Sequence, residues 1–161
     1  MNIHLVEILS EDFVNYKYPS LILAFPYCNM KCNKECGLCV CQNDFLLNKK
    51  IKEYDIDKII MSYISNDITK AIVMQGLEPL DSIKEVLLFI DQLRNVYDIQ
   101  DDVVIYTGYN EDEISNELDY LRTYSNIIVK FGRYLPNQEK HYDEVLQVEL
   151  ASDNQYAKKI S

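Results

Sequence analysis

Short apolar runs alternate with amphipathic stretches along most of this chain, and this alternation constrains the fold more than any other feature. The apolar runs are rich in Ile, Val and Leu, as the buried strands of parallel sheets are. They cover residues 3–8, 21–25, 71–74, 103–106, 127–130 and 145–150. Strands that alternate with helices predict right-handed βαβ crossovers, and therefore an α/β fold with mostly parallel strands.

The stretches between these runs predict three helices, because each places its apolar residues on one face at helical spacing. The three faces are Ile56, Ile59, Ile60 and Ile64; Ile83, Val86, Leu87, Ile90 and Leu93; and Ile114, Leu118 and Leu121. Asp81 is predicted to cap the second helix, and Asn110 to cap the third with Glu113 in a capping box. Residues 42–55 are harder to place and are predicted to form a loop.

Five of the predicted strands are each followed by a segment whose side chains could bind a ligand or a metal. These segments are the cysteine run 28–41 and residues 75–79, 107–109, 132–134 and 152–155. In parallel α/β proteins, ligands bind at the carboxyl ends of the strands, so we expect these segments to converge on one site. Lys130 interrupts an apolar run close to this site, where it would either face the site or extend to the surface.

The size and charge of the chain limit which classes of protein and partner are possible. A length of 161 residues suits a single domain spanning residues 1–161. A formal net charge of −10 disfavours nucleic acid as a partner, since that binding depends on Lys and Arg. The longest apolar run, residues 21–26, is too short to span a bilayer, and residues 1–9 lack the core of a secretory signal. We therefore expect a soluble cytoplasmic protein that binds neither membrane nor nucleic acid.

All five cysteines fall between positions 28 and 41. In a cytoplasmic protein, where disulfides are rare, such clustering indicates metal or redox chemistry rather than buried structural thiols. Zinc is one alternative, although Cys36 and Cys39, a pair at a usual zinc spacing, have no second pair at a distance. Thiolates also bind iron–sulfur clusters, which we favour. If three cysteines bound a 4Fe–4S cluster, one iron would stay open to a substrate, whereas a fully ligated cluster would mainly transfer electrons.

A family resemblance extends over most of the chain. The segment Phe25-Pro26-Tyr27-Cys28-Asn29-Met30-Lys31-Cys32, closing on Cys41-Gln42-Asn43, resembles the cluster loop of radical S-adenosylmethionine (SAM) enzymes. The closer resemblance is to the activating proteins of anaerobic ribonucleotide reductases. Gly76-Leu77-Glu78-Pro79 stands where that family has Gly-Gly-Glu-Pro. The other matching segments are Asp12-Phe13-Val14-Asn15-Tyr16, Thr107-Gly108-Tyr109, Gly132-Arg133-Tyr134 and Ser152-Asp153-Asn154-Gln155.

The resemblance implies a fold and an activity. The fold would be a partial, open β/α barrel of the radical SAM type with mostly parallel strands, and the chain is short for a full barrel of about 250 residues. A 4Fe–4S cluster would split SAM into methionine and a 5′-deoxyadenosyl radical. In the activating branch, this radical would generate a glycyl radical on a large anaerobic ribonucleotide reductase. A donor such as flavodoxin or ferredoxin would supply the electron.

The resemblance also implies the residues that hold SAM. Glu78, with the backbone near Gly76, would bind the amino group of SAM through a charge-assisted hydrogen bond. Thr107 and Gly108 would contact its methionine or ribose part. Asn154 would hydrogen-bond the adenosine, since an amide offers both donors and an acceptor.

The cysteine spacing departs from the family, which has three and then two intervening residues. One possible ligand set is Cys28, Cys32 and Cys41, with six residues inserted in the second gap. The other is Cys32, Cys36 and Cys39, which has the usual spacing. We favour the first set because it keeps the opening of the cluster loop directly after the predicted strand.

Leu77 is a second departure, because it replaces a glycine that would permit positive φ or close approach of a ligand. Three other functions stay open at this stage. The chain would act as a radical SAM enzyme on another substrate, as a ferredoxin-like 4Fe–4S electron carrier, or as a zinc-stabilised binding module. The number of cysteines that bind the metal centre, and its response to SAM, would separate them.

Overall fold

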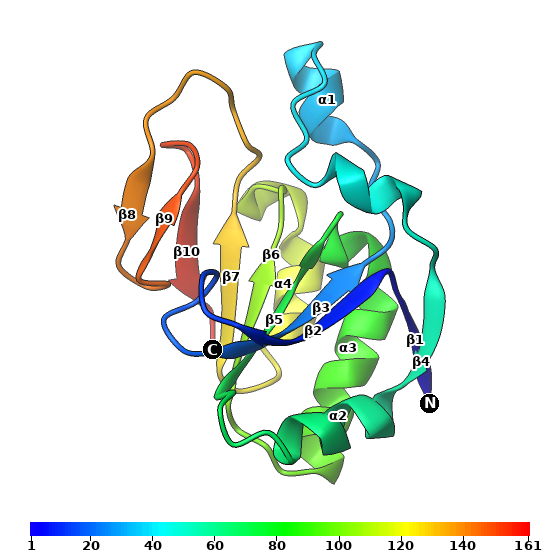
Figure 1. The fold of residues 1–161 in the computed structure, drawn as a ribbon. Coiled ribbons are helices and arrows are strands. Elements are labelled where there is room, and N and C mark those ends of the chain that lie inside the picture. The colour runs from blue at the N-terminus through cyan, green and yellow to red at the C-terminus, as the bar shows by residue number, and fades with distance from the viewer.

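The computed structural model describes residues 1–161, and its main element is a six-stranded sheet in the order β10-β7-β6-β5-β3-β2 (Figure 1). The four inner strands run parallel to one another: β3 (Ser20–Phe25), β5 (Ala71–Gly76), β6 (Asp102–Tyr106) and β7 (Ile127–Phe131). The edge strands, β2 (Glu7–Asp12) and β10 (Tyr156–Lys159), run antiparallel to their neighbours. The inner strands are buried on both faces, which explains their continuous apolar sequences.

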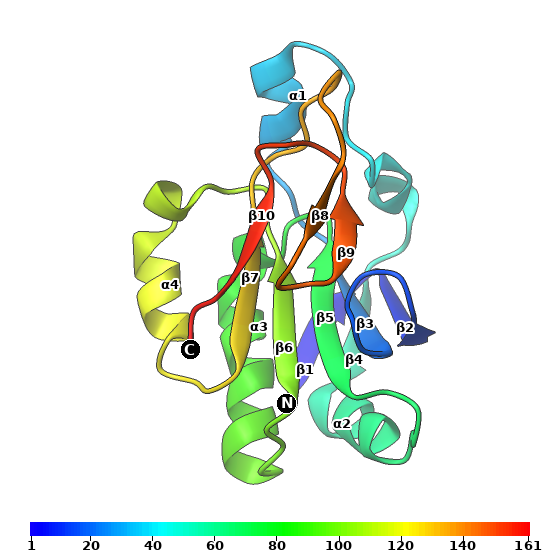
Figure 2. The same ribbon diagram turned by 90° about the vertical axis from the view of Figure 1, so that its left-hand side faces the viewer.

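Helices cover one face of this sheet (Figures 1 and 2). They are α2 (Ile56–Ile64), α3 (Ile83–Asp91), its π-helical continuation η3 (Gln92–Val96), and α4 (Ser115–Leu121). Each predicted apolar face packs into the main core, except that Ile64 is half exposed. The three helices lie in successive crossovers between neighbouring parallel strands, and a constant crossover hand places them all on the same face.

A hairpin covers the opposite face of the sheet (Figure 2). It consists of β8 (His141–Asp143) and β9 (Val148–Leu150), which pair antiparallel. Leu146 and Leu150 of the hairpin share a buried cluster with Val73 and Val104 of the sheet and with Tyr16 from the loop after β2. The central strands are therefore enclosed on both sides.

Smaller elements surround the sheet. A two-stranded sheet pairs β1 (Asn2–Leu5) with β4 (Lys52–Asp55), so residues 3–8 do not form one strand as predicted. Helix α1 (Lys31–Cys36) projects beyond the strand ends and contains no buried residue (Figure 1). Three short 3₁₀ helices are η1 (Asp44–Asn48), η2 (Pro79–Ser82) and η4 (Glu111–Glu113). None of the helices combines the length and apolar character that a membrane span requires.

The predicted partial β/α barrel is wrong. The sheet is mixed and ends at two antiparallel edge strands that do not pair with each other, so it does not close. Residues 145–150, which we expected to form a further parallel strand, lie in the hairpin instead. Asp143 turns the chain there, because its Oδ1 accepts hydrogen bonds from the backbone N–H groups of Val145 (3.0 Å) and Leu146 (2.8 Å).

The two predicted helix caps have different outcomes. The capping box of Asn110 and Glu113 is confirmed, and it begins η4, directly ahead of α4. Asp81 does not cap α3, because it lies within η2 and its carboxylate accepts hydrogen bonds from Asn29 and Tyr109 instead. Residues 42–55, predicted as a loop, contain η1 and β4.

Candidate functional site

The carboxyl ends of the parallel strands surround a cavity of about 290 Å³. Its wall contains residues from all five segments that follow the predicted strands. The hairpin strand β9 contributes to the wall as well. The volume lies at the small end of the range of about 300–1,000 Å³ that is typical of small-molecule sites. The cavity is therefore the natural place for a ligand of this protein.

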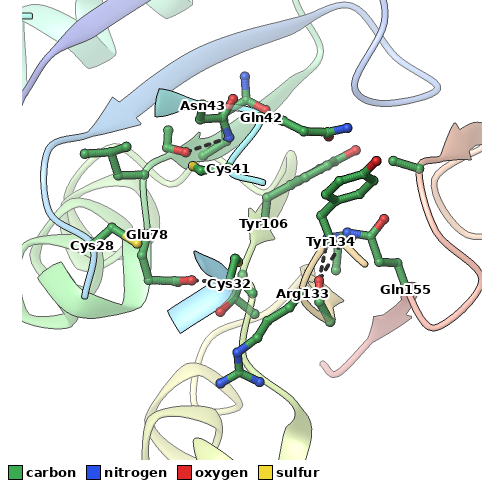
Figure 3. A pocket seen from close by; sticks show the side chains of 18 of the residues that line it. Cys28, Cys32, Cys41, Gln42, Asn43, Glu78, Tyr106, Arg133, Tyr134 and Gln155 are labelled. Atoms are coloured by element: carbon green, nitrogen blue, oxygen red, sulfur yellow. Dashed lines mark hydrogen bonds between the residues drawn. The ribbon is translucent and has the colours of Figure 1, made fainter. Parts of the chain in front are cut away.

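Cys28, Cys32 and Cys41 line the cavity, whereas Cys36 and Cys39 do not. Figure 3 shows Cys28 and Cys32 beside Glu78, and Cys41 close to Asn43. Cys36 is the last residue of α1, and Cys39 is exposed in the loop after it. All three members of one predicted ligand set therefore line the cavity, whereas only Cys32 of the other set does.

Hydrogen bonds of two asparagines hold the segment around Cys41 at the cavity. The Oδ1 atom of Asn33 accepts hydrogen bonds from the backbone N–H groups of Val40 (2.9 Å) and Cys41 (3.0 Å). These bonds close residues 34–39 into a loop that does not line the cavity. The Nδ2 atom of Asn43 donates to the carbonyl oxygen of Gly76 (3.0 Å), which attaches the end of the cysteine run to the end of β5 (Figure 3).

Burial disfavours the thiolate form of two of these cysteines when no metal is bound. It raises the pKa of Cys28 to about 11, and a hydrogen bond from the backbone N–H of Met30 (3.2 Å) opposes the rise only in part. Burial and the neighbouring Cys41 also raise the pKa of Cys32, whereas Arg133 lowers it. As free thiols, Cys28 and Cys32 would therefore be weak nucleophiles.

Glu78 is a buried carboxylate in the cavity wall, with an exposed fraction of 5%. Its Oε1 accepts a hydrogen bond from the backbone N–H of Leu80 (3.1 Å), and its Oε2 accepts one from Gly108 (2.9 Å). The side chain therefore joins the ends of β5 and β6. Burial raises the pKa of Glu78 to about 7, against the effect of hydrogen bonds from Gly108, Leu80 and Thr107. A cationic group in the cavity would stabilise the ionised form.

Gly76 and Leu77 shape the loop that leads to Glu78. Gly76 has a φ of +108°, and a Cβ atom there would lie 2.7 Å from the backbone nitrogen of Phe25, so the position requires glycine. Leu77 does not have positive φ. Its backbone N–H donates to the carbonyl oxygen of Phe25 (3.2 Å), and its side chain packs against the small apolar cluster that includes Leu46. The loop therefore accepts leucine in place of the family's second glycine.

Thr107 and Gly108 both line the cavity, as predicted from the end of their strand. The backbone N–H of Thr107 donates to the carbonyl oxygen of Lys130 (2.9 Å), and its Oγ1 accepts from the backbone N–H of Tyr109 (3.0 Å). Gly108 presents its N–H to Glu78. These bonds hold the turn after β6 against both neighbouring strands.

Lys130 faces the cavity and is almost completely buried. Its Nζ donates to the carbonyl oxygen of Gly132 (3.0 Å) and lies 5.8 Å from the ring centroid of Tyr106. Burial lowers the pKa of Lys130 to about 8. The interrupted apolar run signalled this lysine, and the segment 132–134 included Tyr134. Nothing in the pattern distinguished Tyr106, which also lines the cavity, from an ordinary core tyrosine.

Arg133 connects the cavity wall to the segments around it. Its guanidinium points away from the cysteines (Figure 3) and donates two hydrogen bonds to the carboxylate of Glu113 (2.8 and 2.7 Å). These bonds lower the pKa of Glu113 to about 2. Glu35 of α1 lies 3.4 Å from the Nε atom of Arg133. The arginine thus ties the end of β7 to η4 and to the cysteine run.

Asn154 lies beside the cavity but does not line it. Its Nδ2 donates to the carbonyl oxygen of Arg133 (2.8 Å), and its Oδ1 accepts from the hydroxyl of Ser152 (2.7 Å). The neighbouring Gln155 does line the cavity, and it donates to the carbonyl oxygen of Gly132 (3.2 Å). The contact predicted between Asn154 and adenosine stays a prediction.

The donor set of this cavity fits a 4Fe–4S cluster. Three thiols from one short run of the chain share its wall, and thiolate is the usual ligand of such clusters. No three His, Cys, Asp or Glu side chains meet around a single metal-ion position. The thiols of the cavity wall therefore indicate a protein of the iron–sulfur class.

Comparison with known proteins agrees with this class. The family description "4Fe-4S single cluster domain" matches residues 21–156. The chain therefore belongs to the family of 4Fe–4S single cluster domains. The matched region contains every cysteine and every wall segment that follows an inner strand. Searches of curated proteins and of solved structures found no match.

Proposed function

We propose that this protein is a radical SAM enzyme whose 4Fe–4S cluster occupies the cavity beside Glu78. The observation that carries the proposal is the shared cavity. Three thiols, a buried carboxylate and the turn after β6 line the same space, although they lie far apart in the sequence. An electron carrier needs the thiols alone, whereas SAM binding also uses a carboxylate for the ammonium group.

In this proposal, Cys28, Cys32 and Cys41 bind the cluster and leave one of its irons open for SAM. When bound, the cluster supplies the electron that splits SAM into methionine and a 5′-deoxyadenosyl radical. The protein orients SAM and excludes water from the cleavage. Its residues hold the methionine end at the ends of β5 and β6, because Glu78 and Gly108 meet there.

Glu78 binds the ammonium group of SAM in this arrangement. Each of its oxygens accepts one backbone hydrogen bond, and beside the bond from Thr107 the carboxylate keeps a free lone pair for a ligand. The buried carboxylate gains a counter-charge when the ammonium arrives. Gly76 lets the loop pass close to β3, and Thr107 and Gly108 contact the methionine or ribose part of SAM.

The substrate that we propose is a backbone glycine of a large anaerobic ribonucleotide reductase, with flavodoxin or ferredoxin as the electron donor. The support is the ordered set of segments that resembles the activating proteins, from residue 12 to residue 155. Co-expression with a large reductase, followed by a search for a glycyl radical, tests this choice separately from SAM cleavage itself.

Electron paramagnetic resonance (EPR) of the anaerobically reconstituted, reduced protein tests the proposal. We expect the spectrum of a reduced 4Fe–4S cluster that changes shape when SAM is added, because SAM binds the open iron. A cluster spectrum that ignores SAM would contradict the proposal and indicate an electron carrier. Zinc bound without iron would contradict the assignment of a cluster.

The variant Glu78→Gln is expected to keep the cluster but to weaken SAM binding by about tenfold or more, since a hydrogen bond to a charged group contributes about 1.5–3 kcal/mol. The change removes the negative charge and one of two acceptor oxygens. A titration of the EPR change with SAM measures the effect. Glu117→Gln is the matched control, because Glu117 lies on α4 outside the cavity wall. Equal SAM affinity in the Glu78→Gln variant and wild type would exclude this role.

A further inference from the structure

Tyr109 connects the cysteine run to the rest of the site. Its hydroxyl donates to Oδ1 of Asp81 (2.6 Å) and accepts from Nδ2 of Asn29 (2.8 Å). The other oxygen of Asp81 accepts from the backbone N–H of Asn29 (3.0 Å). Asn29, Asp81 and Tyr109 therefore form a closed set of three contacts, with one residue each from the cysteine run, η2 and the turn after β6.

The ring of Tyr109 makes a second set of contacts. The Nζ of Lys31 lies 4.6 Å from the ring centroid, and the guanidinium of Arg133 lies 5.8 Å from it. Both cations also pair with Glu113, at 3.4 Å and 2.7 Å. Cations over an aromatic ring are attracted to it, so the ring holds Lys31 and Arg133 beside the same carboxylate.

Polar contacts rather than apolar packing hold the start of the cysteine run. Helix α1 contains no buried residue, so apolar packing does not fix its position. Asn29 lies next to Cys28, and Lys31 lies next to Cys32, so Tyr109 contacts an immediate neighbour of each of these cysteines. A thiol that is already oriented toward the cavity loses less conformational entropy when it binds a metal centre.

We propose that Tyr109 is a positioning residue that holds the segment from Cys28 to Cys32 over the cavity, through its hydroxyl contacts with Asn29 and Asp81 and its ring contact with Lys31. The inference rests on the proposed role of Cys28 and Cys32 as cluster ligands. Tyr109 itself binds neither the cluster nor SAM in this proposal. Its loss would loosen the ligands and leave the sheet and its helices intact.

The test is the rate at which reconstituted protein loses iron to an excess of chelator. We expect Tyr109→Phe, which removes only the hydroxyl, to release iron about tenfold faster than wild type, since the lost bond to a carboxylate is charge-assisted. Tyr109→Leu removes the ring as well and is expected to release iron faster still. Adding Asp81→Ala to Tyr109→Phe is expected to increase the rate by less than the product of the single effects, because the two residues share one contact.

Tyr97→Phe is the matched control. The hydroxyl of Tyr97 also donates to a carboxylate, that of Asp57 (2.9 Å), on elements that do not line the cavity. If Tyr97→Phe and Tyr109→Phe accelerate iron loss equally, or if Tyr109→Phe leaves the rate unchanged, the positioning role is excluded. The response to SAM is measured on the same samples. A cluster that ignores SAM but depends on Tyr109 would overturn the proposed function and support this inference, whereas wild-type protein that binds no cluster would overturn both.

Discussion

Serine in place of Cys28, Cys32 or Cys41 is expected to abolish assembly of the 4Fe–4S cluster, whereas serine in place of Cys36 or Cys39 is expected to preserve it. The first three thiols share one cavity wall, and the other two lie outside it. A serine hydroxyl stays protonated where a cysteine gives a thiolate, so each replacement in the cavity removes a ligand. Iron and sulfide per chain after anaerobic reconstitution measure the result.

The same five variants separate the competing ligand sets. Loss of the cluster in Cys36→Ser and Cys39→Ser, with retention in Cys28→Ser and Cys41→Ser, would assign the cluster to Cys32, Cys36 and Cys39 instead. A requirement for four cysteines would leave no open iron and would support an electron carrier. Urea unfolding of each metal-free variant shows whether lost binding reflects lost folding.

Gly76→Ala is expected to lower the free energy of unfolding by about 3 kcal/mol. This is the second of the two largest effects that we expect. The added Cβ would lie 2.7 Å from the backbone nitrogen and 2.8 Å from the carbonyl oxygen of Phe25. Backbone atoms in a central strand cannot yield as a flexible side chain does, so overpacking costs about 1–3 kcal/mol. The φ of +108° adds a strain of about 1–2 kcal/mol for any L-residue with a side chain.

Gly37→Ala is the matched control for Gly76→Ala. Gly37 also has positive φ, +64°, but a Cβ there would meet nothing within 4 Å. Only the conformational cost of positive φ remains, so we expect the free energy of unfolding to fall by about 1 kcal/mol. Urea unfolding of the metal-free proteins measures both changes. An equal fall in the free energy of unfolding for the two variants would show that the contact with Phe25 does not exclude a side chain at position 76.

The four inner strands were predictable because burial on both faces removes polar residues from them. Residues 71–74 and 127–130, for example, read as continuous apolar runs and form β5 and β7. The edge strand β10 was not predictable on this basis. Its sequence, Tyr156-Ala157-Lys158-Lys159, is mostly exposed and polar, and it is recognisable as a strand only by its pairing with β7. The barrel was predicted from the family resemblance, and because β10 was not recognised, nothing in the sequence corrected it.

The location of the candidate site was predicted more reliably from the ends of the strands than from single residues. Segments that end parallel strands of one sheet must lie along the same edge, so Cys28, Glu78 and Thr107 meet whatever their side chains do. Asp81 was misassigned because a carboxylate ahead of a helix is typical of a cap. Its real partners, Asn29 and Tyr109, are 52 and 28 residues away in the sequence, and no local pattern reports contacts at that separation.

The loop closed by Asn33 has a consequence for how this chain tolerates change in length. Because one side chain joins position 33 to positions 40 and 41, residues 34–39 form a detour that begins and ends at nearly the same place. Without the detour, Cys32 and Cys41 would be separated by two residues, Asn33 and Val40. The entropic cost of closing such a loop grows only slowly with its length. The detour is therefore a site where an affinity peptide or a spectroscopic label can be grafted next to the cavity while Cys32 and Cys41 keep their spacing in space.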